Sequence, residues 1–107
     1  MTKKYQKFQD YLVDKLNNPK EAQTFFDAAI EVFEEDGDTE AFMLALRYLT
    51  EAKGGVNKLS KTTKLNRQNL YKILTGKTSP KLETTFTIIN GLGYHLKAKP
   101  ADNLLFD

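Results

Sequence analysis

The chain has 107 residues, of which 40% are apolar and 28% are charged, and its mean hydropathy is −0.52. These values predict one globular domain with a single core, and the absence of Cys excludes disulfides and Cys-based zinc sites. The longest apolar run, Ala41 to Leu46, is far shorter than the roughly 20 residues that a membrane span needs. The basic N-terminus lacks the apolar core of a signal peptide, so we expect a cytoplasmic protein.

The formal net charge of +2 conceals two halves of opposite sign. Residues 1–51 carry six Lys and Arg against 11 Asp and Glu, a net of −5, whereas residues 52–107 carry ten against three, a net of +7. The stretch from Gly54 to Lys81 holds six Lys and one Arg but no carboxylate. This asymmetry indicates one half that avoids polyanions and one half that binds them, although a solvated basic face has the same composition.

Apolar residues recur at helical spacing through the acidic half. The first predicted helix covers about residues 2–17 and places on one face Tyr5, Phe8, Leu12 and Leu16. Asn18, Pro19 and Glu21 then match a capping box with proline at the first helical position, which predicts a second helix over residues 19–35 that Gly37 ends. Its apolar residues are Ala22, Phe25, Phe26, Ala29, Ile30 and Phe33. The aromatic residues of the two helices suit a core, a dimer interface or a partner-binding surface; they are Tyr5, Phe8, Tyr11, Phe25, Phe26 and Phe33.

Four further helices are predicted. The third, capped by Asp38, covers residues 39–53 and ends at Gly54 and Gly55, and two short helices follow over residues 56–63 and 67–75. Ser79 and Pro80 open a last helix that reaches residue 90. Residues 94–99 alternate apolar and polar side chains, which predicts a short strand. The residues expected inside are Phe42, Met43, Leu46, Leu49, Val56, Leu59, Leu82, Phe86, Ile89 and Leu92.

The two short helices, separated by about three residues, are typical of a helix-turn-helix. Leu59 and Leu65 would hold the two helices together, and Asn66 would cap the second one. On a wheel of about 100° per residue, the second helix buries one face and exposes the other. The buried face consists of Leu70, Ile73 and Leu74, and the opposite face of Gln68, Lys72 and Thr75.

The exposed face carries groups that can read base edges in a major groove. Gln can pair with adenine, and Arg or Lys with guanine, each worth roughly 1–3 kcal/mol of discrimination. Arg67, Gln68 and Lys72 are therefore the candidate base-reading residues; Arg67 is long enough to reach past the helix end. The N–H groups at Val56 could also meet phosphates, as could Lys58, Lys61, Lys64, Lys77, Thr78 and Lys81. A carboxylate in this stretch would face the DNA backbone and be repelled by it, which explains why the stretch has none. The alternative to a DNA-binding surface is a basic helical hairpin without function.

The segment "GGVNKLSKTTKLNRQNLYKILTGKTSPKLETTFTIINGLGYHLKAKPA" resembles the lambda-repressor-like (Xre-type) helix-turn-helix. Over residues 17–100 the chain resembles more closely the antidote proteins of bacterial toxin–antitoxin addiction modules. The landmarks are "NNPKEAQTFFDAAIEVF", "GDTEAFMLALRYLTEAKGG", "NRQNLYKIL" and "SPKLETTFTIINGLG". The implied fold is all-α or mainly α, a lambda-repressor-like five-helix domain with an N-terminal helical extension and a short C-terminal strand. We divide the chain into an acidic helical extension over residues 1–37, a helix-turn-helix DNA-binding domain over 38–100 and a tail over 101–107.

The resemblance also implies a function. Antidotes of this kind form homodimers on palindromic operator DNA, repress their own operon and neutralise a RelE/ParE-like ribonuclease toxin. By match to the motif, Arg67, Gln68 and Lys72 read bases, and the DNA backbone is contacted by Lys61, Asn69, Lys77 and Thr78. Two positions depart from the pattern: Lys64 stands where Gly is usual, which predicts a strained turn, and Ser60 stands where Ala is usual.

Catalytic, metal and cofactor sites are not indicated. His95 is the only histidine and has no recognisable partners, and the acidic run over residues 31–38 lacks the spacing of a calcium loop. Ser60 and Ser79 have no base at a recognisable distance in sequence, so we expect no enzyme. Three functions stay open: a DNA-binding antidote, a module that masks a toxin and has a vestigial DNA surface, and a general nucleic-acid binder.

Overall fold

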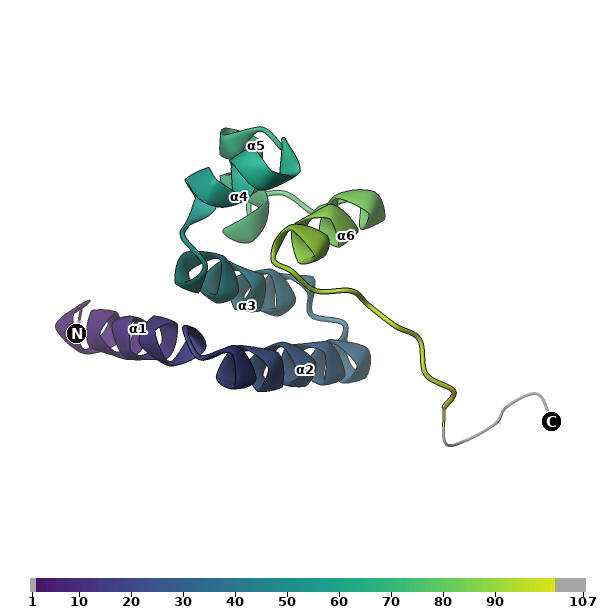
Figure 1. The fold of residues 1–107 in the computed structure, drawn as a ribbon, viewed down its shortest axis with the longest axis horizontal. Coiled ribbons are helices and arrows are strands. Elements are labelled where there is room, and N and C mark those ends of the chain that lie inside the picture. Colours follow the sequence, from purple (N-terminus) through teal and green to yellow (C-terminus); the bar gives the residue numbers. More distant parts are fainter. Residues whose placement is uncertain (1, 102–107) are drawn as a thin grey trace.

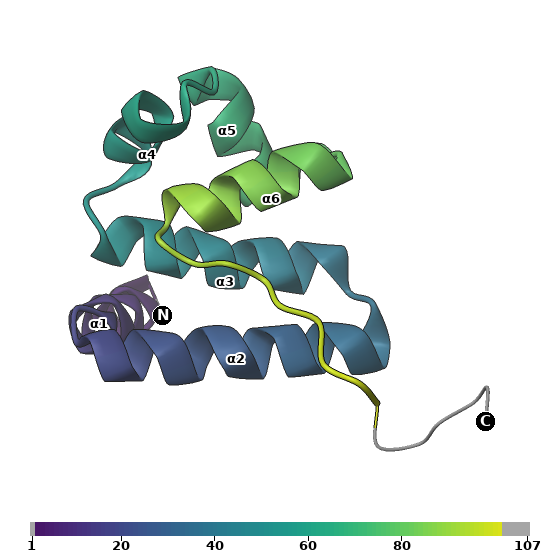
Figure 2. The ribbon, with the colours of Figure 1, turned by 45° about the vertical axis from the view of Figure 1, so that its right-hand side comes forward.

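A computed structural model describes residues 2–101 of the chain, with side chains from residue 7 onward. Within this range the fold is all-helical, with six helices and no strand, which confirms the all-α expectation. The third helix lies between the two N-terminal helices on one side and the three short helices on the other (Figures 1 and 2). The helices are α1 (Thr2–Leu16), α2 (Pro19–Asp36), α3 (Thr39–Ala52), α4 (Val56–Thr63), α5 (Arg67–Leu74) and α6 (Leu82–Gly91).

The predicted cap of α2 is present, but its partner residue acts differently from a capping box. Asn18 Oδ1 accepts hydrogen bonds from the backbone N–H groups of Lys20 and Glu21 at 2.9 and 3.3 Å. The Asn18 N–H, which a capping box would pair with the Glu21 side chain, donates to the Lys15 carbonyl at 3.2 Å. The Glu21 carboxylate instead lies 3.6 Å from Lys15 Nζ, so this corner ties α2 to the end of α1.

α3 supplies the centre of the core because it contacts α1, α2, α4 and α5. Leu46 and Leu49 are fully buried, and burying one such side chain contributes about 1.5–3 kcal/mol. Thr50, the one buried polar side chain among the described residues, donates its hydroxyl to the Leu46 carbonyl at 2.7 Å. The polar group is therefore satisfied within its own helix.

Phe8, which suited a core, a dimer interface or a partner-binding surface, lies at the surface with 59% of its area exposed. Figure 1 shows the N-terminal part of α1 extending past the end of α3, where no helix covers it. Leu12 packs against the core and Leu16 is buried, so the second half of the predicted face is covered. The side chain of Tyr5 lies outside the described residues.

The last helix starts later than predicted, and two of its apolar residues point outward. The N-cap is Lys81 rather than Ser79, and the half-buried Pro80 before it lines an apolar hollow. Leu82 and Phe86 are 74% and 42% exposed. They line the same hollow, about 360 Å³ in volume, instead of filling the core.

The predicted strand over residues 94–99 is wrong. Tyr94 stacks on Phe26 of α2 with ring centroids 4.6 Å apart, and Lys53 Nζ lies 4.7 Å above the Tyr94 ring. Burial, together with the Asp27 carboxylate, raises the pKa of Tyr94. The segment crosses α3 and α2 as an extended chain (Figure 2), and the described residues offer no neighbouring strand to pair with it. Of the three alternating apolar residues only Tyr94 is partly buried, whereas Leu96 and Ala98 are exposed, so the alternation does not mark a buried face.

Residues 38–100 contain four helices, α3 to α6, which is the number that the periodicity predicted for this range, so these residues alone do not make up a five-helix domain. The next helix that packs with them is α2, which contacts α3 along the chain reversal at Gly37. A five-helix unit would thus have to include α2. Of the predicted tail, only residue 101 lies within the described residues.

Candidate nucleic-acid interface

The turn between α4 and α5 is built around Lys64. This residue has φ +63° and ψ +17°, which places it in the left-handed region, and it is the only non-glycine with positive φ in the described part of the chain. Its N–H donates to the Ser60 carbonyl at 2.7 Å and closes α4. The strained turn predicted from Lys64 is thus confirmed.

Hydroxyl groups satisfy the backbone of this turn. Ser60 Oγ donates to the Leu65 carbonyl at 2.6 Å, so the residue that departs from the family pattern links α4 to the start of α5. Thr63 Oγ1 donates to the Leu59 carbonyl at 2.7 Å and accepts from the Leu65 N–H at 3.2 Å. The turn is therefore held by polar contacts as well as by apolar packing.

Asn66 caps α5 as predicted, since its Oδ1 accepts from the Asn69 N–H at 3.0 Å. The opposite end closes with Gly76 at φ +77°, whose N–H donates to the Ile73 carbonyl, while the Lys77 N–H donates to the Lys72 carbonyl at 2.9 Å. This pair of bonds is a Schellman motif. The predicted inner face is confirmed, because exposures of 0–4% are found for Leu70, Ile73 and Leu74.

The three candidate base-reading residues, Arg67, Gln68 and Lys72, are all exposed. Gln68 and Lys72 lie one turn apart on the face of α5 that Leu70 and Leu74 leave free. The Arg67 Nε donates to Asn57 Oδ1 on α4, so the guanidinium is held across the gap between the two helices. The sequence analysis did not identify Asn57 as a partner of Arg67. The signal that could have indicated it is a polar side chain in the first turn of α4, within reach of α5.

Every candidate backbone contact is exposed to solvent. The residues lie on α4, in the turn, at the start of α5 and between α5 and α6; they are Lys58, Lys61, Lys64, Asn69, Lys77, Thr78 and Lys81. Lys77 Nζ lies 6.0 Å from the Tyr71 ring centroid, which draws it toward α5. In the described chain no lysine of this set forms an ion pair, so the charges are available.

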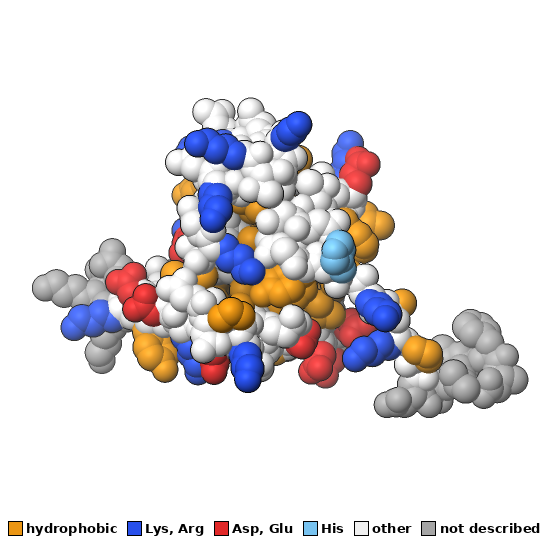
Figure 3. All heavy atoms as spheres, viewed as in Figure 1, with side chains coloured by type: hydrophobic (Ala, Val, Ile, Leu, Met, Phe, Trp, Pro, Cys, Tyr) orange, Lys and Arg blue, Asp and Glu red, His pale blue; other side chains and the backbone are white. Residues whose placement is uncertain are grey.

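The carboxylates lie mostly away from α4 and α5, whereas Lys and Arg side chains occur over both parts of the molecule (Figure 3). Figure 3 shows Lys and Arg side chains over the upper part of the molecule, where α4 and α5 lie, and most of the visible carboxylates lower down, over α1 and α2. Residues 52–82 contain no Asp or Glu. This separation gives the α4–α5 surface a positive potential that favours polyanions.

Comparison with known proteins decides the family. A family described as "Probable addiction module antidote protein" matches residues 6–100 of the chain. The chain belongs to this family. No significant match was found among curated proteins or solved structures. An antidote acts on a toxin, so membership implies a toxin partner.

The described residues include neither a candidate membrane span nor a candidate metal site. No helix there is long and apolar enough to cross a membrane. No group of three or more His, Asp or Glu side chains in that part of the chain could hold a metal ion.

Proposed function

We propose that this antidote binds its own operator specifically as a homodimer, represses its toxin–antitoxin operon and neutralises a RelE/ParE-like toxin. The observation that carries the proposal is the outer face of α5, where Gln68 and Lys72 are exposed beside Arg67 on a surface without carboxylates. We keep the proposed division of the chain: an acidic extension over residues 1–37, a DNA-binding part of lambda-repressor-like type over 38–100, and a tail over 101–107.

The proposed contacts follow from side-chain chemistry. Gln68 would pair with an adenine, and Arg67 and Lys72 with guanines, each contact being worth about 1–3 kcal/mol of discrimination. Lys58, Lys61, Lys64, Lys77 and Lys81 would bind phosphates, with Asn69 and Thr78 donating hydrogen bonds to the backbone. In a homodimer, two α5 helices about 34 Å apart would read the half-sites of a palindrome. We assign no catalytic step, metal or cofactor to this chain.

Substitution of Gln68 by Ala tests the base-reading role. Because Gln68 is exposed, the fold should be retained, while discrimination between adenine and other bases at one operator position should fall by about tenfold or more. Fluorescence anisotropy with the palindrome upstream of the operon, and with single-base variants of it, measures this preference.

Lys77→Ala is the matched control, because a lost phosphate contact should weaken binding to all sequences alike. A Gln68→Ala variant whose base preference matches the wild type would show that α5 does not read the operator through this residue.

The second candidate is a module that masks the toxin without specific DNA binding. It is favoured by the acidic composition of α2 and α3, since residues 19–52 contain nine Asp and Glu but only two Lys and Arg. Such a module would bind its toxin yet bind all duplexes equally. The anisotropy measurement above separates this module, and likewise a general nucleic-acid binder, from the proposed repressor; binding of the toxin then separates the module from the general binder.

A further inference from the structure

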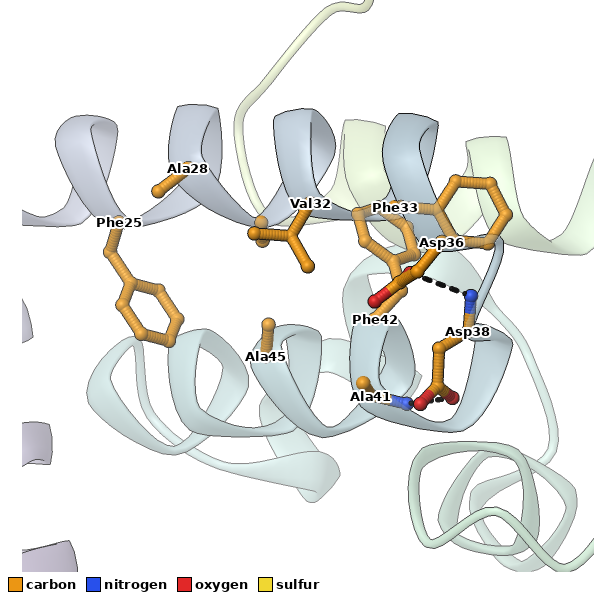
Figure 4. Close-up of a pocket in the computed structure, with 10 residues that line it drawn as sticks. Phe25, Ala28, Val32, Phe33, Asp36, Asp38, Ala41, Phe42 and Ala45 are labelled. Atoms are coloured by element: carbon orange, nitrogen blue, oxygen red, sulfur yellow. Dashed lines mark hydrogen bonds between the residues drawn. The ribbon is translucent and has the colours of Figure 1, made fainter.

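The pair formed by α2 and α3 leaves an apolar hollow open to solvent, away from α4 and α5. Its volume is about 220 Å³. Figure 4 shows Val32 and Phe25 of α2 lying opposite Ala45 and Ala41 of α3, with Ala28 beside them. Val32 is 49% exposed, and Ala28 and Ala41 are also exposed. Because small-molecule pockets usually measure about 300–1,000 Å³, this hollow is better suited to side chains of a protein partner.

Carboxylates crowd one end of this hollow. Asp36 and Asp38 line it, and the last turn of α2 also contains Glu34 and Glu35 but no basic residue. Asp36 accepts from the Asp38 N–H at 2.9 Å, which keeps both residues at the rim. Between residues 19 and 52 the chain has nine carboxylates against two cations. The ion pairs formed by carboxylates in the described residues are those of Glu21 with Lys15 and Glu51 with Arg47.

This placement of charge opposes the stability of α2. The C-terminal end of a helix carries the negative end of the helix dipole, so three consecutive carboxylates there are unfavourable, and they also repel one another. Proteins keep locally unfavourable features of this kind mainly at functional sites, so the carboxylates at the end of α2 point to a function there. A cationic partner would offset both repulsions when it binds.

We propose that the α2–α3 hollow binds a basic amphipathic helix of the toxin. Its apolar residues would fill the floor between Phe25, Val32 and Ala45, and its Lys or Arg side chains would meet Asp36, Asp38 and Glu35. The alanines on both helices allow close approach of a third helix. A second copy of this chain would bring the same acidic rim against itself, and like charges would oppose that contact.

The inference rests on the proposed function in one respect, namely that neutralisation occurs by direct binding of the toxin. The experiment uses the full chain and the toxin encoded beside it, with affinity measured by isothermal titration calorimetry. On a wheel of about 100° per residue, Ala28 and Glu35 flank the hollow, and Glu34 lies nearly opposite on the same helix. Glu34 therefore provides a matched control for each change.

Ala28→Trp, which obstructs the hollow, and Glu35→Lys, which reverses a rim charge, should each weaken toxin binding by about tenfold or more. Glu34→Trp and Glu34→Lys should remain within about threefold of the wild type. Glu35→Lys should also raise the melting temperature of the free antidote, because it removes an unfavourable charge from the end of α2. Circular dichroism establishes that each variant is folded, and operator affinity should be unchanged in all four.

Toxin affinity that is unchanged in both Ala28→Trp and Glu35→Lys would overturn the inference, as would equal losses in the Glu34 controls. If sedimentation shows that Ala28→Trp dissociates a homodimer while toxin binding persists, the hollow binds a second copy and the inference is wrong. A wild-type chain that does not bind the toxin would refute both the inference and the toxin part of the proposed function. Operator binding reports separately on the DNA part.

Discussion

At Lys64 a side chain with a β-carbon occupies a backbone conformation that favours glycine. The left-handed region costs an L-residue about 1–2 kcal/mol, yet the turn from α4 to α5 requires it. The side chain is exposed, so core packing does not account for the choice of Lys. The proposed contact with the DNA backbone offers a reason. The Lys64 ammonium group would bind a phosphate, and this gain in binding free energy would offset the cost of the left-handed conformation in the free protein.

Lys64→Gly separates these two effects. The free energy of unfolding should rise by up to about 1 kcal/mol, because glycine adopts positive φ without steric cost but loses more entropy on folding. Operator affinity should fall at the same time, since one phosphate contact is lost. Urea denaturation and fluorescence anisotropy measure the two quantities.

Lys64→Asn is the control for Lys64→Gly, because Asn tolerates the left-handed region and also removes the charge. Its operator affinity should fall as much as that of the glycine variant. A Lys64→Gly variant with unchanged operator affinity would show that this ammonium group does not contact DNA.

At the scale of elements, the close approach of α6 to α4 positions α4 and α5 on the rest of the fold. A β-carbon at Gly91 would collide with the Thr63 side chain and lie 3.0 Å from Leu59 Cδ1. Thr63 cannot easily turn away, because its hydroxyl bonds to the Leu59 carbonyl and accepts from the Leu65 N–H. Gly91 thus allows α6 to pack on the residues that hold the turn.

Gly91→Ala should therefore destabilise the protein by about 1–3 kcal/mol, which is the usual cost of overpacking. The same change should weaken operator binding, since α4 must shift to accommodate the methyl group. Asn90→Ala, an exposed neighbour in α6, should leave both quantities nearly unchanged. Thermal denaturation provides the measurement, and an equal melting temperature for the two variants would contradict the packing argument.

At the scale of the whole molecule, α3 joins an acidic pair of helices to a basic group of three. Among the candidate backbone contacts, each chain offers five lysines on the basic surface. Each phosphate that a lysine neutralises contributes about −0.9 to the slope of log affinity against log salt concentration. A dimer in which all ten lysines bind phosphates therefore has a limiting slope of roughly −9. Operator affinity measured at salt concentrations between about 50 and 200 mM gives this slope.

The operator should stay preferred over unrelated DNA throughout this titration, because base contacts are less sensitive to salt than phosphate contacts. Five Lys→Gln changes at these positions should make the slope much shallower. A shallow slope in the wild type, with no preferred sequence, would favour the masking module over the repressor.

The helices were predictable because their caps and periodicity are local. Asn18, Asp38 and Asn66 cap the helices that their side chains predict, and Gly37 and Gly76 adopt the positive φ that ends them. The local pattern misled at residues 94–99, where alternation indicated a strand. A strand needs a partner, and the chain instead placed Tyr94 on Phe26.

The candidate site was only partly predictable for the same reason. The exposure of Gln68 and Lys72 follows from their angular positions relative to Leu70, which sequence alone supplies. The contact between Arg67 and Asn57 depends on how α4 crosses α5, and no spacing within one helix encodes it. Likewise, the hollow between Val32 and Ala45 exists only because α2 and α3 pack side by side.

By itself, the amino-acid sequence determined the helices, the charge difference between the two halves and the candidate DNA surface, because each depends on residues close together in the chain. Tertiary structure decided which apolar side chains are covered. Leu82 and Phe86 have the spacing of core residues and lie on the same side of α6 as the buried Ile89, yet both are exposed because they border an open hollow instead of meeting another helix. Burial is a property of the neighbours that a helix meets, and those neighbours are distant in sequence.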